Sequence, residues 1–267
     1  MRKVFIVFTT LIFIYNSCTT VPITGRQRVN LVSDSQILPS SFEMYSGFLK
    51  DNKVSKNVAK TNEIRQIGGK ISKAVDKFMR ANGMVEEADS YKWEFNLIED
   101  KAMNAWCLPG GKVVFYEGIL PICANDDGIA AVMGHEIAHA FAKHGQERMT
   151  AGYAQQLGGV AVAIGTSKDD PKKQAIWQTV YGIGSTVGML KYSRVHETEA
   201  DKLGMVFMIM AGYNPEEAVN VWVRMSANGN NSTPEFLSTH PSHETRIQDL
   251  KAYMPTAISM AAKYNSK

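Results

Sequence analysis

The sequence predicts an α+β protein that is mostly helical, and two observations support this fold class. Apolar residues recur at helical spacing before residue 85 and again after residue 125. Between these regions lies a shorter stretch with the alternating pattern of β-strands. Hydrophobic residues make up 45% and charged residues 21% of the 267 residues, an ordinary globular composition that allows a substantial hydrophobic core.

The N-terminus has the pattern of a targeting signal. Arg2 and Lys3 precede an apolar run over residues 4–15, which is too short to span a bilayer and is typical of a signal peptide. Cys18 follows, as in bacterial lipoproteins whose cysteine becomes the lipidated N-terminus. A plain secretory signal or an uncleaved anchor is the alternative. We therefore predict a signal peptide over 1–17, a lipidated N-terminus and linker over 18–33, and one domain over 34–267.

This N-terminus predicts a location and a partner. An acylated Cys18 would tether the chain to a membrane surface without spanning the membrane. The predicted location is the bacterial cell envelope, facing the periplasm, with a lipid anchor. The formal net charge is only +3, and Arg2 and Lys3 account for two of these charges, so no nucleic-acid partner is expected.

Helices and strands are then expected in a definite order. Residues 34–84 predict two or three helices, and residues 91–98, 102–105 and 112–116 predict three strands. Pro109, Gly110 and Gly111 mark the turn between the last two strands. The remaining helices are expected over about 127–149, 171–192, 196–212, 215–227 and 243–253.

Two features of the chain have more than one interpretation. Residues 151–165 are apolar and rich in glycine, which favours a helix packed on the core over a segment that touches a membrane. Cys107 and Cys123 could form a disulfide outside the cytoplasm or remain part-buried thiols.

The segment His135-Glu136-Ile137-Ala138-His139 is the motif HExxH. Helix positions four apart differ by about 40°, so His135 and His139 share one face and can bind a single Zn²⁺. Glu136 lies about 100° round the helix, beside the metal, where its carboxylate can take a proton from an attacking water. Apolar neighbours surround the motif, so the helix should be buried and its polar side chains should need partners.

The third ligand is not in the same segment. Ala142 and Gly145 stand where a metzincin would have glycine and histidine, which excludes that class. His144 is nine residues after His135, about half a turn away, so we interpret it as a solvated or capping histidine.

Residues 193–201, with the sequence SRVHETEAD, supply a better candidate. Glu197 and Asp201 are four residues apart and share a helix face, so Glu197 can bind the metal while Asp201 orients a ligand histidine. A solvated acidic run is the alternative for this stretch alone, but the HExxH motif favours ligands. His196 is the rival ligand, although it lies about 100° off the face. Two histidines, one glutamate and one open position indicate a catalytic site.

Taken together, these motifs resemble the HtpX/BepA/LoiP-like zinc endopeptidases, which are relatives of the CAAX prenyl protease. The resemblance rests on HEIAH, on SRxxExxxD downstream, on Asn104-Ala105 with 108–115, and on 239–241 with Arg246. It covers roughly residues 30–255 and implies a zincin (gluzincin-type) metalloprotease core. Because the chain lacks transmembrane helices around this core, the resemblance points to the soluble or lipoprotein branch.

The resemblance also implies roles for residues that spacing leaves open. It implies that the strand after the Pro-Gly-Gly turn is an edge strand that pairs with substrate; this strand contains Lys112, Val113, Val114 and Phe115. His240 resembles a histidine that takes the fourth zinc position at rest and moves aside for substrate. From the residues alone, His240 is a turn histidine and His243 an exposed one. Arg246 could support the site or form a surface ion pair.

The sequence therefore predicts a zinc endopeptidase with one Zn²⁺ per chain and a polypeptide substrate, in the family's case misfolded or envelope proteins. Zinc ligands are His135, His139 and Glu197; Glu136 is the general base, and His240 is a second catalytic residue. The alternative function is a chaperone-like envelope assembly factor with a structural or latent zinc site. The intact Glu136 argues against that alternative.

Overall fold

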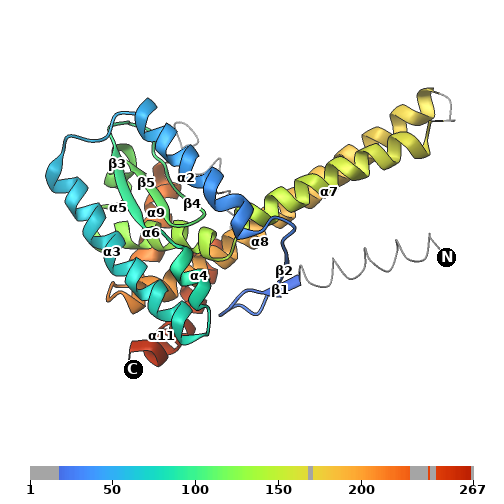
Figure 1. Ribbon diagram of the computed structural model, residues 1–267. Coiled ribbons are helices and arrows are strands. Elements are labelled where there is room, and N and C mark those ends of the chain that lie inside the picture. The colour runs from blue at the N-terminus through green and yellow to red at the C-terminus, as the bar shows by residue number, and fades with distance from the viewer. Residues whose placement is uncertain (1–17, 168–170, 229–239, 241–244, 266–267) are drawn as a thin grey trace.

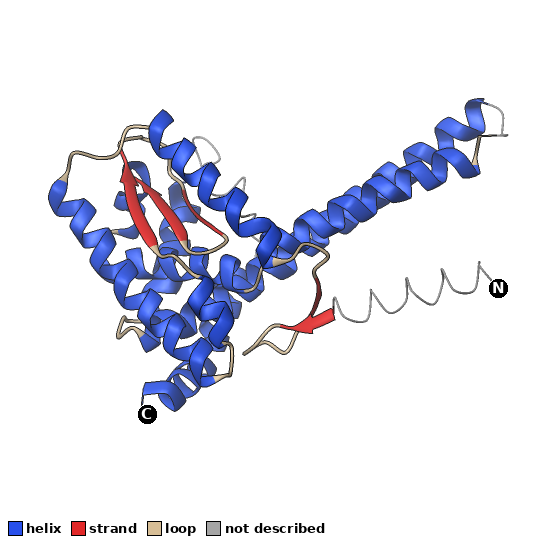
Figure 2. Ribbon diagram, viewed as in Figure 1, coloured by secondary structure: helices blue, strands red, loops and turns tan. Residues whose placement is uncertain are grey.

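The computed structural model describes residues 18–167, 171–228, 240 and 245–265. The predicted signal peptide over 1–17 lies outside this part, as does His243. The described chain is mostly helical with two small sheets, which confirms the coarse fold class (Figure 2). Its helices are α2 (Asp34–Asp51), α3 (Val58–Ala81), α4 (Val85–Ser90), α5 (Leu120–Cys123), α6 (Asp126–Phe141), α7 (His144–Gly165), α8 (Pro171–Met210), α9 (Glu216–Asn228) and α11 (Arg246–Asn265).

The larger sheet has the strand order β3–β5–β4, with β3 (Glu94–Ile98) parallel and β4 (Ala105–Leu108) antiparallel to β5 (Lys112–Tyr116). Gly110 and Gly111 both have positive φ angles, which lets the chain reverse tightly between β4 and β5. Side chains of β5 alternate between two apolar clusters because successive residues of a strand point to opposite faces.

This strand order corrects one prediction. The strand that contains Lys112, Val113, Val114 and Phe115 is the central strand β5, and its backbone pairs with a neighbour on each side. A central strand has no free edge at which a substrate could pair. The free edge nearest the HExxH helix belongs to β4, since β4 is the strand that packs against α6.

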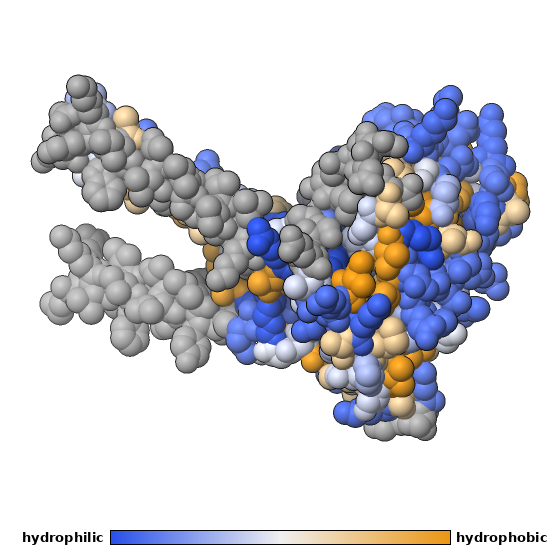
Figure 3. All heavy atoms as spheres, turned by 180° about the vertical axis from the view of Figure 1, so that it is seen from behind, coloured by the Kyte–Doolittle hydropathy of each residue, from blue (hydrophilic) through white to orange (hydrophobic). Residues whose placement is uncertain are grey.

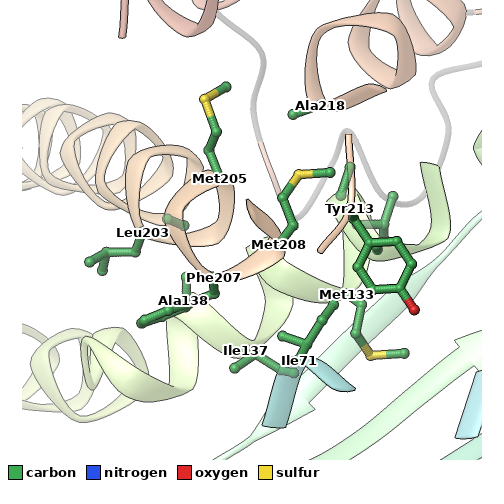
Figure 4. Packing of buried hydrophobic residues seen from close by; sticks show 14 of the residues in the cluster. Ile71, Met133, Ile137, Ala138, Leu203, Met205, Phe207, Met208, Tyr213 and Ala218 are labelled. Carbon is green, nitrogen blue, oxygen red and sulfur yellow. The ribbon is translucent and has the colours of Figure 1, made fainter. Parts of the chain in front are cut away.

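Helices cover both faces of the sheet. On one face Tyr45 of α2 packs with Ile98 and Val114. On the other face lie α3 and α6, and behind α6 the main core continues into α8, α9 and α11 (Figure 1). Figure 4 shows the centre of this core, where side chains of α6 such as Met133 and Ile137 meet those of α8 such as Phe207 and Met208. From behind, hydrophobic patches alternate with hydrophilic ones on the surface of the body (Figure 3).

The most prominent feature outside the body is a projecting pair of antiparallel helices, formed by α7 and the first part of α8 (Figure 1). We call this pair the arm. The helices expected separately over 171–192 and 196–212 are one continuous α8 of 40 residues. Residues 151–165, for which packing on the core was favoured, lie on the arm and are mostly exposed or half-buried. Within the described residues, no helix is both long and apolar enough to cross a bilayer.

Part of the predicted linker over 18–33 is folded. β1 (Cys18–Thr20) and β2 (Gln27–Val29) pair as an antiparallel hairpin. Arg28 is buried and donates a hydrogen bond to the carbonyl oxygen of Ala142 at 2.8 Å, and this bond fixes the hairpin beside the end of α6. Cys107 and Cys123 are both free thiols, so the structure favours the second of the two interpretations of these cysteines.

Candidate metal centre

The site is built on α6, which carries the HExxH motif. The side chain of Asn125 caps this helix by accepting a hydrogen bond from the backbone N–H of Gly128 at 2.8 Å. From Gly128 onward every residue of α6 is buried, as the apolar surroundings of the motif predicted. His135, Glu136 and His139 are 4%, 2% and 5% exposed, so their polar atoms depend on partners inside the protein.

Two glycines bring α8 against α6 at the level of the motif. A Cβ atom added to Gly134 would lie 2.8 Å from the carbonyl oxygen of Gly204, and one added to Gly204 would lie 2.7 Å from the backbone nitrogen of His135. Any larger side chain at either position would push the helices apart. This close contact sets the distance between the imidazoles of α6 and the carboxylates of α8.

Four side chains converge on one point. Nε2 of His135 lies 3.1 Å from Nε2 of His139 and 3.3 Å from Oε2 of Glu197. Nε2 of His139 lies 3.4 Å from Oε1 of Glu197. His240 Nδ1 lies 3.3 Å from His135 Nε2 and 3.1 Å from Glu197 Oε2, which makes it the fourth member of the group.

These separations fit a tetrahedral ion. A tetrahedral site with bonds of about 2.0–2.1 Å has ligand atoms about 3.3 Å apart. The distances given above, 3.1–3.4 Å, are close to that spacing, and the donor set of imidazole nitrogens and one carboxylate is the set that catalytic zinc sites use. The residues present therefore fit a zinc ion.

Asp201 and Arg246 hold the first ligand. Asp201 accepts hydrogen bonds from His135 Nδ1 at 3.0 Å and from Arg246 Nη2 at 2.6 Å, so Nε2 of His135 is left to face the metal position. The Arg246 guanidinium stacks on the ring of Trp222 at 3.3 Å and is 1% exposed, which excludes the surface ion pair considered for this residue. Burial lowers the pKa of His135, but Asp201 and Glu197 outweigh it and raise that pKa to about 9. The surroundings of His135 thus favour positive charge.

His144 holds the second ligand, and the prediction for this residue was wrong. It is fully buried, with Nδ1 2.8 Å from His139 Nδ1 and Nε2 2.9 Å from Glu199 Oε2. The predicted helix over 127–149 ends at Phe141, and Lys143 adopts a left-handed conformation with φ of 60°. The chain therefore changes direction, and α7 begins with His144 pointing back to the site rather than away from it.

The hydrogen-bond chain assigns the protons. Burial holds the pKa of His144 well below its usual value, so this imidazole is neutral and carries a single proton. Because Nε2 of His144 donates to Glu199, its Nδ1 must accept from Nδ1 of His139. Nε2 of His139 is then unprotonated and available to a metal.

Arg26, in the loop between β1 and β2, binds the carboxylate at the end of this series of hydrogen bonds. Its Nε donates to Glu199 Oε2 at 2.7 Å, and its Nη1 donates to Glu147 Oε2 at 2.8 Å. Thr24 also donates to Glu199. Sequence reasoning missed Arg26, Glu147 and Glu199. They come from three separate segments, so no local sequence pattern marks them as a group.

His196, the rival third ligand, lies outside the group of four. It stacks on His144 with ring centroids 4.1 Å apart, and its Nε2 lies 3.6 Å from Glu147 Oε2. His144, Glu147 and His196 are themselves close enough to hold an ion, but the Arg26 guanidinium already supplies the positive charge beside Glu147. Among the described residues, Glu197 is the α8 side chain that faces both motif histidines.

Glu136 lies beside the four donors. Burial raises the pKa of its carboxyl group, which moves the pKa toward neutrality. Its Oε1 is buried and accepts no hydrogen bond from the described residues; Nε2 of His240 lies 3.4 Å from it. A buried carboxylate oxygen in this position can accept a proton from a water molecule beside the ion.

Comparison with known proteins places this geometry in a family. The profile of peptidase family M48 matches residues 66–254, which include α6, α8 and all four converging side chains. The chain belongs to peptidase family M48. Membership confirms the predicted class, a metalloendopeptidase, at the level of the family.

Relatives within family M48 refine the resemblance. The mitochondrial metalloendopeptidase OMA1 of Schizosaccharomyces pombe is 34% identical over 189 residues, which are 70% of this chain and 53% of that protein. OMA1 of Saccharomyces cerevisiae is 37% identical over 181 residues, 63% of this chain and 49% of that protein. The β-barrel assembly-enhancing protease of Escherichia coli K12 is 27% identical over 179 residues, 63% of this chain and 36% of that protein. The chain thus spans about half the length of the OMA1 relatives.

These relatives change two predictions. The family M48 resemblance is confirmed, but the HtpX/BepA/LoiP branch is not singled out, since OMA1 proteins match as well. The predicted bacterial cell-envelope location is wrong by this comparison, because the OMA1 relatives from fungi, a plant and animals are mitochondrial. Lipidation at Cys18, membrane attachment and a preference for misfolded proteins find no support and stay predictions.

Proposed function

We propose that this chain is a zinc-dependent endopeptidase whose single zinc ion is held by His135, His139 and Glu197. The observation that carries the proposal is the spacing of the three donor groups around one point, with the carboxylate of Glu136 beside them. When bound, zinc supplies a Lewis acid that polarises the scissile carbonyl and makes water more acidic. A structural site has no need of a base beside it, so Glu136 favours catalysis over the chaperone-like alternative.

Glu136 moves the proton. Its carboxylate takes a proton from the attacking water and passes it to the nitrogen of the leaving amine, so one group serves as base and then as acid. The raised pKa of Glu136 suits both steps, because a carboxyl group of ordinary acidity would be a weaker base and would hold the proton less well before delivery. Asp201 and His144 keep the two imidazoles in the tautomer that the reaction needs.

His240 closes the site in this conformation. Its Nδ1 stands at the fourth corner of the donor group, and its Nε2 is 3.4 Å from Glu136. Substrate carbonyl and water need that corner, so His240 has to move aside before cleavage. Once displaced, its imidazole is expected to stabilise the oxyanion that develops on the carbonyl.

The polypeptide substrate binds along the free edge of β4. This strand pairs with β5 on one side only, and it packs against the helix that carries Glu136. An extended peptide added to that edge forms main-chain hydrogen bonds that do not depend on its side chains. The expected selectivity is therefore for unfolded or extended polypeptides rather than for a fixed sequence.

The decisive experiment compares wild type with Glu136→Gln. We expect the variant to bind zinc as wild type does and to cleave casein about 10²–10⁴-fold more slowly, because the general base is lost while the ligands remain. Zinc content by atomic emission and casein cleavage with and without a chelator are the measurements. Glu63→Gln, a change in an exposed ion pair on α3, is the matched control and should leave both unchanged. Cleavage by Glu136→Gln at the wild-type rate would falsify the assignment.

A second experiment tests whether His240 blocks the fourth corner of the metal site. If His240 occupies the fourth corner at rest, His240→Ala should raise the initial rate of casein cleavage at low substrate concentration, and the apparent KM should fall. A drop in kcat without a change in KM would instead assign His240 to the oxyanion alone. A wild-type protein that binds zinc and cleaves nothing would support the assembly-factor alternative.

A further inference from the structure

The outer face of α7 carries an apolar stripe. Five large hydrophobic side chains are spaced four, four, three and four residues apart, so they fall within an arc of about 80° on the helix. Their exposed fractions run from 38% to 69%, although four of the five side chains are aliphatic. The arm stripe consists of Met149, Tyr153, Leu157, Val160 and Ile164, and it is about 22 Å long.

Two long stretches of the arm carry no charge. Between Arg148 and Lys168, and again between Lys173 and Lys191, the sequence has no charged residue and no histidine. The half-buried side of α7, opposite the stripe, is formed by four small residues together with one glutamine and one valine: Ala151, Gly152, Gly158, Gly159, Gln155 and Val162. The large side chains of α7 therefore point outward, and its small residues face α8. This arrangement is the reverse of that in a soluble coiled coil and is typical of helices that pack together in lipid.

The base of the arm contacts the β1–β2 hairpin and carries basic residues. The β1–β2 hairpin lies at the base of the arm, where the backbone N–H of Leu31 donates to Thr150 of α7 at 3.0 Å. In the sequence, the apolar run over residues 4–15 comes just before Cys18, at which the hairpin begins. Arg148 and Arg194 are exposed near the same base, and basic residues outnumber acidic ones at the borders of both uncharged stretches.

We propose that the arm stripe docks on the surface of a lipid bilayer that contains anionic headgroups. The arm lies along the membrane, with its large side chains in the boundary between headgroups and acyl chains. This orientation agrees with the finding that no described helix is long and apolar enough to cross a bilayer. Docking would hold the metal centre at a fixed height above the membrane, next to the substrates found there.

A second copy of the chain fits the stripe less well than lipid does. Protein partners that meet in water surround an apolar centre with a polar, charged rim, and paired helices use flanking charges to set their register. The uncharged stretch that carries the arm stripe provides no such rim. Lipid acyl chains need none, and the basic residues at its ends match anionic headgroups.

A local probe tests the contact on the full chain. Leu157→Cys in a Cys18→Ser background is labelled with an environment-sensitive dye at neutral pH; burial raises the pKa of Cys107 and raises that of Cys123 to about 12, so both label slowly. Vesicles of phosphatidylcholine with phosphatidylglycerol should shift the dye emission to the blue and increase it. The matched control is Val58→Cys on α3, which is 69% exposed like Leu157 and should not respond.

Vesicle flotation supplies the second measurement. Leu157→Gln combined with Ile164→Gln should lower the partition coefficient about tenfold, whereas Val58→Gln combined with Ile258→Gln should not change it. The proposal is overturned if the full chain floats with vesicles while the Leu157 probe stays unchanged, or if nothing floats. A blue shift without vesicles that grows with protein concentration would assign the stripe to a second copy and would also overturn it.

Discussion

The metal centre and the arm treat charge and apolar surface in opposite ways. Around Glu197 and Asp201 the body buries charge, and each charged group there contacts a group of opposite charge or an imidazole. On the arm, a stretch without any charge exposes large apolar side chains. Buried charge is costly unless it is paired, and exposed apolar surface is unfavourable in water. The contrast agrees with the two proposals made above, a metal ion inside the body and a lipid surface against the arm.

The largest effect that this contrast predicts is at Arg246. Replacing it by Met keeps the stacking volume over Trp222 but leaves Asp201 and Glu197 without their buried cation. We expect Arg246→Met to lower the free energy of unfolding by about 3–5 kcal/mol, measured by urea denaturation. The control is Arg194→Met at the base of the arm, where the residue is exposed and the expected change is within about 0.5 kcal/mol. An equal loss of unfolding free energy in Arg246→Met and Arg194→Met would contradict the difference between the body and the arm.

The apolar half of the contrast is tested by one leucine in each region. Leu203 of α8 is fully buried, so Leu203→Ala should cost about 2–5 kcal/mol of unfolding free energy through lost burial and the cavity left behind. Leu157 on the arm stripe is 69% exposed, so Leu157→Ala should change it by no more than about 0.5 kcal/mol in the absence of lipid. A large loss at Leu157 would mean that the stripe is covered within the protein.

Much of the body could be predicted from local spacing. The HExxH motif and the pair Glu197 and Asp201 each depend on helix periodicity, which a sequence displays directly. The buried character of α6 and the hairpin turn at Gly110 and Gly111 were likewise visible in the sequence. These are the features for which a single segment carries the whole signal.

The errors fall where distant segments meet or where the chain bends. The break at Lys143 turns His144 toward His139, and one residue with a positive φ angle leaves little trace in a pattern of apolar residues. The position of β5 at the centre of the sheet depends on β3 pairing with it from outside the hairpin, which strand patterns do not reveal. On the arm, the sequence predicted helix correctly, but it could not show that the arm stripe is left exposed by the part of the body that the structure describes.

Arg26 lies where the two regions join and gives the smallest of the three expected effects. It pairs with Glu147 of α7 and Glu199 of α8, and Glu199 orients His144 behind the ligand His139. Arg26 is 19% exposed, so water replaces part of the lost pairing, and Arg26→Gln should lower the free energy of unfolding by about 1–3 kcal/mol.

The same variant should weaken zinc binding, measured by competition with a chromogenic chelator, because a carboxylate without its cation orients His144 less firmly. Arg80→Gln is the matched control: Arg80 also pairs with two carboxylates, Asp76 and Asp89, but at an exposed position, and neither measurement should change appreciably. Loss of stability with unchanged zinc affinity would show that the hairpin supports the base of the arm alone. Loss of both stability and zinc affinity would show that the β1–β2 hairpin also orients the ligands of the metal centre.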